Sequence, residues 1–168
     1  MSTERPPLAV RDITETDRPG LEAVLRSDKT FTADEVAVAL ELIDDGLDGQ
    51  SKDYWFRIAT IGDSIAGYIC FGPTPMTAST YDLYWIVCHT EFRGRGIARR
   101  LIEAMEARLA ELDATAIRVE TASQESHEAA RRLYAALEYP EAARFPNFYS
   151  AGDDLLVYYK QLVPRLVR

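Results

Sequence analysis

The segment Glu91–Arg100 limits the possible folds of this 168-residue chain more than any other stretch. It follows an apolar run typical of a β-strand (83–88) and leads directly into an amphipathic helical pattern. Gly94 and Gly96 let the backbone turn tightly, so that several N–H groups can point into one concavity. The start of the following helix adds unpaired N–H donors and a partial positive charge. A strand, a glycine turn and a helix in this order indicate an anion-binding turn in an α/β fold.

The charge around this turn differs from that of the whole chain. The formal net charge is −8, yet four arginines surround the turn: Arg93, Arg95, Arg99 and Arg100. This local positive charge predicts an anionic ligand such as a phosphate or pyrophosphate. The acidic balance of the chain argues against nucleic acid or an anionic membrane as the main partner. It is compatible with a cationic amine substrate, although it also simply favours solubility.

Compartment and metal content can be predicted from a few absences in the sequence. No apolar run approaches the roughly 20 residues that span a bilayer, and the N-terminus lacks the apolar core of a signal peptide. Cys70 and Cys88 lie in strand-like runs and are expected to be buried, reduced thiols. With only two histidines in the chain, no His/Cys metal cluster is predicted. We therefore expect a cytoplasmic, metal-free protein.

Hydrophobic periodicity predicts a single α/β domain over residues 1–168, with a mixed sheet of about seven strands flanked by about four helices. Strands are expected at 8–13, 55–61, 65–71, 80–88, 116–121, 142–149 and 155–162. Helices are expected at 18–27, 33–46, 97–112 and 126–138. Gly62-Asp-Ser64 is typical of a hairpin turn.

Two common phosphate-binding motifs do not fit the glycine turn. A Walker loop ends in Gly-Lys-Ser/Thr, and a dinucleotide fingerprint needs a third glycine where Arg99 stands. The actual pattern is Arg-x-x-Gly-x-Ala, formed by Arg93, Gly96 and Ala98 between a strand and a helix. This pattern strongly resembles the pyrophosphate loop of the GNAT superfamily of acyl-CoA-dependent N-acyltransferases. The resemblance is sharpest from Tyr81 to Leu162, with an acyl-CoA-binding core at about 80–138.

The resemblance implies acetyl-CoA as co-substrate and names the residues that would bind it. Strand positions would pair with the pantetheine amides, and the glycine turn would hold the pyrophosphate. His127 stands where many members carry an asparagine that touches the coenzyme; a surface role at the start of a helix is the alternative. The expected coenzyme-binding residues are Ile86, Val87, Cys88, Arg93, Gly94, Arg95, Gly96, Ile97, Ala98, Arg99 and His127.

Tyr134 is the candidate general acid. It lies in Ala-Arg-Arg-Leu-Tyr-Ala-Ala-Leu-Glu-Tyr, which resembles the family helix Ala-x-x-Leu/Phe-Tyr-x-x-x-Gly-Phe/Tyr. The resemblance implies that its hydroxyl protonates the departing thiolate, which a phenol with a pKa near 10 can do. Core packing is the alternative. Glu138 replaces the usual glycine, at a cost of about 1 kcal/mol if that position requires a positive φ.

A proton acceptor is also needed, because a nucleophilic amine must be neutral. Asp82 matches the position where the histone-acetylating branch carries its glutamate base. Glu120, on the neighbouring strand, is the second candidate. For either carboxylate, a surface or hydrogen-bonding role is the alternative. Tyr84 shares a strand face with Asp82 and is expected near the substrate.

The closing segment 144–160 resembles a Phe-Tyr-x-x-Gly-Asp-Asp hairpin found in one GNAT group. A similar hairpin occurs in branches that acetylate protein N-termini, where its tyrosine helps to enclose the substrate backbone. Phe148 and Tyr149 are therefore expected to line the acceptor pocket. The alternative is an aromatic-rich hairpin with Gly152 in the turn.

These features predict an enzyme that moves an acetyl group from acetyl-CoA to a primary amine, either a small-molecule amine or an amino acid, by direct attack in a ternary complex. One alternative is a protein N-terminal or lysine acetyltransferase, and another is a non-catalytic CoA-binding regulatory domain. Cys88 is disfavoured as a covalent acyl carrier because a buried strand thiol has no visible activating base. The resemblance also suggests a homodimer.

Overall fold

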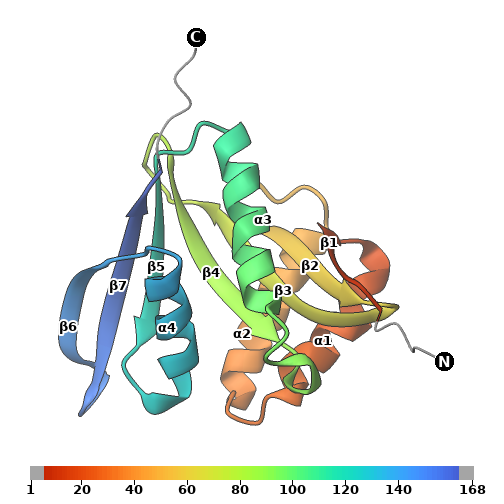
Figure 1. The fold of residues 1–168 in the computed structure, drawn as a ribbon, viewed down its shortest axis with the longest axis horizontal. Coiled ribbons are helices and arrows are strands. Elements are labelled where there is room, and N and C mark those ends of the chain that lie inside the picture. Colours follow the sequence, from red (N-terminus) through yellow and green to blue (C-terminus); the bar gives the residue numbers. More distant parts are fainter. Residues whose placement is uncertain (1–5, 163–168) are drawn as a thin grey trace. The chain divides into compact units, whose positions relative to one another are not determined.

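A computed structural model describes residues 6–162 of the chain. Over these residues it forms seven β-strands and four α-helices, labelled in Figure 1, together with three short 3-10 helices. The strands are β1 (Leu8–Asp12), β2 (Trp55–Ile61), β3 (Ser64–Pro73), β4 (Thr80–Cys88), β5 (Ala116–Ala122), β6 (Glu141–Ser150) and β7 (Asp153–Gln161). The helices are α1 (Arg18–Ser27), α2 (Ala33–Leu47), α3 (Ile97–Glu111) and α4 (Glu128–Ala136).

The strands form one mixed sheet in the order β1-β2-β3-β4-β5-β7-β6, which confirms the predicted fold class. β4 and β5 run parallel, whereas β1–β2, β2–β3, β5–β7 and β6–β7 are antiparallel pairs. The described chain divides into two compact units. The first unit contains residues 6–71 and 85–107, and the second contains residues 72–84 and 108–162, so that β4 contributes to both.

In the first unit, α1 and α2 lie on one face of β2 and β3, and α3 lies on the other (Figure 1). A capping box starts α2: the Thr32 side chain accepts the Glu35 N–H, and the Glu35 carboxylate accepts the Thr32 N–H. The apolar faces of helices and strands then form a fully buried core that includes Leu21, Leu25, Ile43, Ile58, Ile69, Leu101, Ile102 and Met105.

Two features of β3 determine where β4 ends and α3 begins. A β-carbon at Gly67 would lie 2.7 Å from the Val87 carbonyl oxygen and 3.1 Å from the Ile97 side chain, so only glycine fits there. Ala66 is the extra residue of a β-bulge, because its neighbours pair with adjacent residues of β2. Its carbonyl accepts the N–H of His89 at 2.8 Å. The backbone leaving β4 toward the glycine turn is thereby fixed.

In the second unit, β5 lies between β4 and β7, and β6 is the last strand of the sheet. The predicted helix 126–138 is shorter in the structure, because a 3-10 turn (Glu125–His127) precedes α4. Beyond α4, Glu138 has φ +62°. This left-handed conformation costs glutamate about 1 kcal/mol relative to glycine. The N–H of Tyr139 donates to the carbonyl of Tyr134 at 2.9 Å and closes the helix.

Candidate active site

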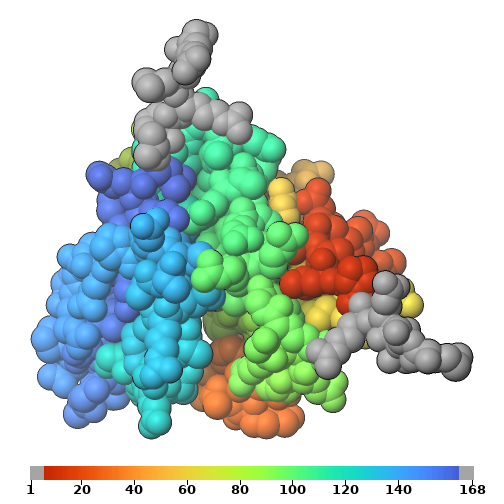
Figure 2. Space-filling view, in the orientation of Figure 1, coloured from red at the N-terminus to blue at the C-terminus, as the bar shows by residue number. Residues whose placement is uncertain are grey.

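The glycine turn is exposed and contains two residues with positive φ. Gly94 and Gly96 have φ of +75° and +76°, and a β-carbon at either position would meet nothing within 4 Å. Glycine is therefore required by the backbone angle and not by lack of space. The turn is exposed and belongs to the green surface in Figure 2. Ile97 is buried and holds the first turn of α3, whose N–H groups can bind an anion.

The arginines of the turn have different surroundings. The guanidinium of Arg93 is paired with the carboxylate of Asp28, at an N–O distance of 2.5 Å. Arg95 lies over the ring of Phe92, 5.3 Å from its centroid. Arg99 is exposed on the first turn of α3. Arg93 therefore already has an internal counter-charge, and Arg95 and Arg99 keep their charge at the surface.

The end of α1 and the loop after it contact β4 and the segment that follows it. Thr90 donates its N–H to the Ser27 hydroxyl at 3.2 Å, and the rings of Phe31 and Trp85 lie 5.8 Å apart. Burial opposes the charge on Asp28, but hydrogen bonds from Thr30 and Arg93 outweigh it, and its pKa lies below its usual value. Sequence analysis missed this network because Asp28 and Arg93 are 65 residues apart and share no local pattern.

The strand positions predicted to bind coenzyme lie at the end of β4. The parallel pairing of β4 with β5 covers Thr80–Leu83 and Ala116–Val119, and Ile86, Val87 and Cys88 lie beyond it. Burial raises the pKa of the Cys88 thiol to about 11, although the Arg93 charge and the Ala98 N–H act in the opposite direction. Cys88 is consequently a neutral thiol near pH 7, which does not suit a nucleophile.

In the second unit, Tyr134 is a buried phenol with only 3% of its surface exposed. Its ring lies 5.4 Å from that of Tyr158 and 6.1 Å from that of Tyr139. Burial raises its pKa, and the neighbouring Tyr158 adds to the effect. The hydroxyl therefore stays protonated and can donate a proton to a strong base.

Asp82, Glu120 and Tyr84 gather around Arg118, a residue that sequence analysis did not select. Asp82 is buried and opposes Arg118 across β4 and β5; both its oxygens accept guanidinium N–H bonds, at 2.7 and 3.1 Å. Glu120 is half exposed, and its Oε1 lies 3.8 Å from Arg118 Nη1. The hydrogen bond to Asp82 raises the pKa of Arg118, burial opposes it, and the negative charges of Asp82, Glu120 and Tyr84 raise the pKa further. Cross-strand register, which a single sequence does not reveal, creates this cluster.

The predicted acceptor residues lie on β6. Phe148 and Tyr149 are 59% and 51% exposed, and their rings meet edge to face at 5.0 Å. The pKa of Tyr149 is raised by partial burial and then by the negative charges of Glu120 and Asp153. Phe148 and Tyr149 therefore form an exposed aromatic pair on β6.

His127 lies in the 3-10 turn before α4, with its Nδ1 3.1 Å from the Ser126 hydroxyl, and its predicted contact with coenzyme stays a prediction. Within residues 6–162, no group of three or more His, Cys, Asp or Glu side chains is arranged to hold a metal ion. None of the helices in this range has the length and apolar character needed to cross a bilayer.

Comparison with known proteins identifies the class of this fold and site. Residues 12–139 match the acetyltransferase (GNAT) family. A GNAT-family protein from Desulfovibrio desulfuricans is 33% identical and superposes with a TM-score of 0.88, covering 94% of this chain and 100% of that one. No curated protein sequence matches the chain.

More distant solved structures share the fold. One is the ribosomal-protein-S18-alanine N-acetyltransferase of Escherichia coli (TM-score 0.75, 17% identity, 96% and 99% of the two chains). Another is an aminoglycoside 6′-N-acetyltransferase complexed with coenzyme A (TM-score 0.74, 15% identity, 95% and 99%). The chain belongs to the GNAT acetyltransferase family. It is an acyltransferase with acetyl-CoA as its acetyl donor.

Proposed function

We propose that the protein acetylates the primary amine of a small, positively charged molecule. The observation that carries this proposal is the exposed aromatic pair of Phe148 and Tyr149, together with the negative charge of Glu120, which after partial burial raises the pKa of Tyr149. A ring face and a carboxylate are the two groups that attract an organic ammonium ion. The net charge of −8 favours the same class of substrate.

The coenzyme side of the reaction is assigned to backbone groups. The N–H groups of residues 94–98 would bind the pyrophosphate, since both glycines hold the turn open and α3 starts behind them. The backbone of Ile86 to Cys88 would pair with the pantetheine amides. Both assignments come from the family resemblance and fit the exposed turn and the extent of the β4–β5 pairing.

The chemical step needs one group that gives a proton and one that takes it. The amine nitrogen attacks the thioester carbon, the carbon–sulfur bond breaks, and Tyr134 gives its hydroxyl proton to the thiolate. We assign the acceptance of the ammonium proton, directly or through water, to Glu120. Asp82 remains the second candidate, but protonating it would break its bidentate pair with Arg118. Positioning of the two reactants would supply most of the rate enhancement.

A second candidate acceptor is the N-terminus of a peptide. It is favoured by the exposed Phe148 and Tyr149, because an aromatic surface can cover an extended backbone as well as a small amine.

Thiol release from acetyl-CoA across pools of amines, amino acids, polyamines, aminoglycosides and N-terminal peptides tests the proposal. Release above hydrolysis with a small cationic amine supports it, and release only with peptides selects the second candidate. Silence in every pool, with coenzyme A binding confirmed by calorimetry, would reject acetyl transfer to amines in favour of a regulatory coenzyme-binding role.

A further inference from the structure

The hairpin of β6 and β7 contains a large irregularity in its register. Phe145 pairs with Leu155, and the next pair is Ser150 with Asp153. Between these pairs β6 contains residues 146–149, whereas β7 contains only Asp154. We call residues 146–149 the β6 bulge. Asp154 is thus the single residue that faces the bulge from the opposite strand.

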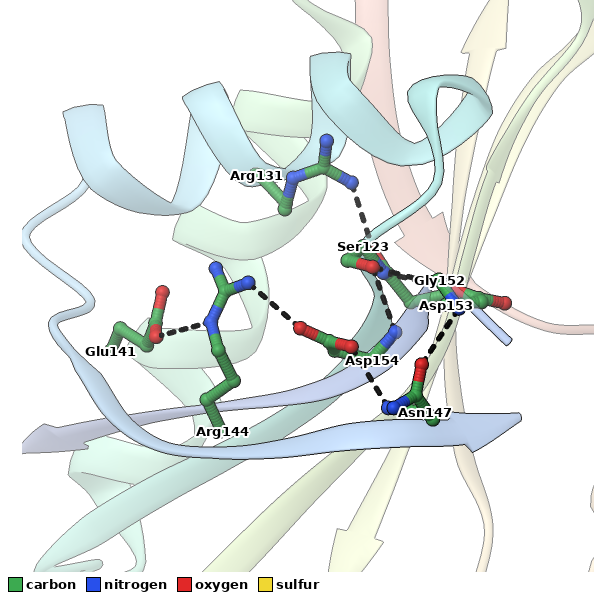
Figure 3. Close-up of polar contacts among 9 residues, drawn as sticks. Ser123, Arg131, Glu141, Arg144, Asn147, Gly152, Asp153 and Asp154 are labelled. Carbon is green, nitrogen blue, oxygen red and sulfur yellow. Dashed lines mark hydrogen bonds and ion pairs between the residues drawn. The ribbon is translucent and has the colours of Figure 1, made fainter. Parts of the chain in front are cut away.

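The side chain of Asp154 fills this position and bonds to the bulge. Its Oδ1 accepts the backbone N–H of Asn147 at 2.9 Å, and its Oδ2 accepts a bond from the Arg144 guanidinium at 3.0 Å (Figure 3). Asn147 has φ +55°, and its side-chain oxygen accepts the N–H of Gly152 at 2.8 Å. The bulge is therefore held at Asn147 by two hydrogen bonds: its backbone N–H donates to Asp154, and its side-chain oxygen accepts from Gly152.

The backbone of Asp154 is fixed in turn against the end of β5. Its N–H donates to the Ser123 hydroxyl at 2.8 Å, and its carbonyl accepts the Ser123 N–H at 3.0 Å. The buried carboxylate of Asp153 also accepts bonds from the Ser123 N–H and the Gln124 side chain, at 3.1 and 2.9 Å. These bonds fix the position of the bulge relative to β5, the strand that carries Glu120.

The bulge carries the two exposed aromatic residues, Phe148 and Tyr149. Because they are more than half exposed, core packing does little to hold them, and the bonds to Asn147 do so instead. In the sheet, β7 lies between β6 and β5, the strand of Glu120, and the negative charge of Glu120 contributes, after partial burial, to the raised pKa of Tyr149. We propose that Asp154 is a positioning residue that sets the affinity for the acceptor amine, by holding the β6 bulge so that its aromatic rings and Glu120 face the same ligand. This inference rests on the proposed function.

The test compares Asp154→Ala with the wild-type enzyme, using the small amine that gives the highest turnover in the panel described above. The variant leaves the Asn147 N–H without its acceptor, so the bulge is released. We expect the KM for the amine to rise about tenfold with kcat within about twofold, the pattern of lost ground-state binding. The dissociation constant of coenzyme A should not change. Asp154→Asn keeps an oxygen for the Asn147 N–H and should restore most of the affinity.

Arg144→Ala is the matched control, because it removes the other partner of Asp154 and keeps the bond to Asn147. Its KM for the amine should stay within about twofold of the wild type. An unchanged amine KM in Asp154→Ala would overturn the inference and leave the proposed function intact. Parallel loss of kcat, coenzyme affinity and thermal stability would also overturn it, since that is the result of a merely structural role. A wild-type enzyme silent toward every amine would reject the proposed function, and this assignment with it.

Discussion

The glycine turn of residues 93–98 and the β6–β7 hairpin are held in place by different means. In the turn, positive φ at Gly94 and Gly96 and the start of α3 present backbone N–H groups, and one of the arginines, Arg93, is already paired with Asp28. In the hairpin, side chains do the positioning: the carboxylate of Asp154 holds the bulge that carries the aromatic pair. The first arrangement depends on where glycine occurs, and the second depends on which strands become neighbours.

This difference explains why the two regions impose different demands on substitution. A backbone site tolerates many side chains but few changes of φ, whereas a side-chain site fails when one carboxylate or amide is lost. It also predicts which affinity a substitution changes. Substitutions in the turn should change the affinity for coenzyme A, and substitutions in the hairpin should change the affinity for the acceptor amine.

The largest effect is expected from a change that affects neither binding region. Tyr134→Phe removes the proposed proton donor while keeping the buried ring, so kcat should fall by about 10²-fold. Coenzyme A affinity, measured by calorimetry, should be unchanged. Tyr158→Phe, a change on the neighbouring ring, is the control and should retain most of the activity. Equal losses in the two variants would assign Tyr134 to packing.

Gly96→Ala tests whether the turn works through its backbone. Alanine at φ +76° costs about 1–2 kcal/mol and should displace the N–H groups, so that the dissociation constant of coenzyme A rises about tenfold. Gly49→Ala is a matched control: Gly49 has φ +67° and open space around it, but lies outside the turn. It should lose similar stability with unchanged coenzyme affinity. Equal affinities in both variants would contradict a backbone site.

A smaller effect is expected at the ion pair of Asp28 with Arg93. The pKa of Asp28 is lowered in the folded state, so its stabilising contribution is present above its usual pKa and is lost as the pH falls through the lower folded value. Asp28→Asn should lower the free energy of unfolding by less than about 1 kcal/mol at pH 7, since Arg93 is half exposed. Urea unfolding should show that the difference in free energy of unfolding between the variant and the wild type is smaller near pH 3 than at pH 7. An equal difference at both pH values would contradict a stabilising ion pair. The exposed Asp63→Asn is the control.

The smallest effect is expected at Cys88. Its pKa of about 11 keeps the thiol neutral, and its predicted role uses the backbone, so Cys88→Ala should keep kcat within about twofold. Because this pKa is raised on folding, stability contributed by the wild-type thiol should be lost as the pH rises from about 9 to 11, and the variant should lack this loss. Abolished turnover in the variant would revive covalent catalysis by this thiol.

The sequence predicted elements well where one face of a strand or helix is continuously apolar. The strands at 55–61 and 80–88 and the helix at 18–27 have the predicted bounds. The helix at 126–138 was predicted too long at both ends, because its periodicity runs through a 3-10 turn at one end and through the positive-φ Glu138 at the other. Local patterns indicate where apolar residues recur but not where the hydrogen-bonding type changes.

Among the candidate-site residues, local features could be predicted from the sequence, and contacts between distant segments could not. The glycine turn could be read from the sequence, because positive φ and a helix start are local properties. The partners of the predicted groups could not be read: Asp28 for Arg93, Arg118 for Asp82 and Ser123 for Asp154 all come from distant segments. Strand order and register bring these partners together, and a single sequence leaves both undetermined.

The β6 bulge also affects how the molecule behaves toward other copies of itself. β6 is the last strand in the sheet order, and almost all its residues are exposed, so its outer edge could pair with a strand of another chain. Pro146 has no N–H to offer, and the bulge interrupts the regular row of donors and acceptors. Arg144 and Glu141 add charge to the same strand. The irregularity that presents the aromatic pair should thus also discourage edge-to-edge aggregation, and we expect any homodimer to use a surface other than this edge.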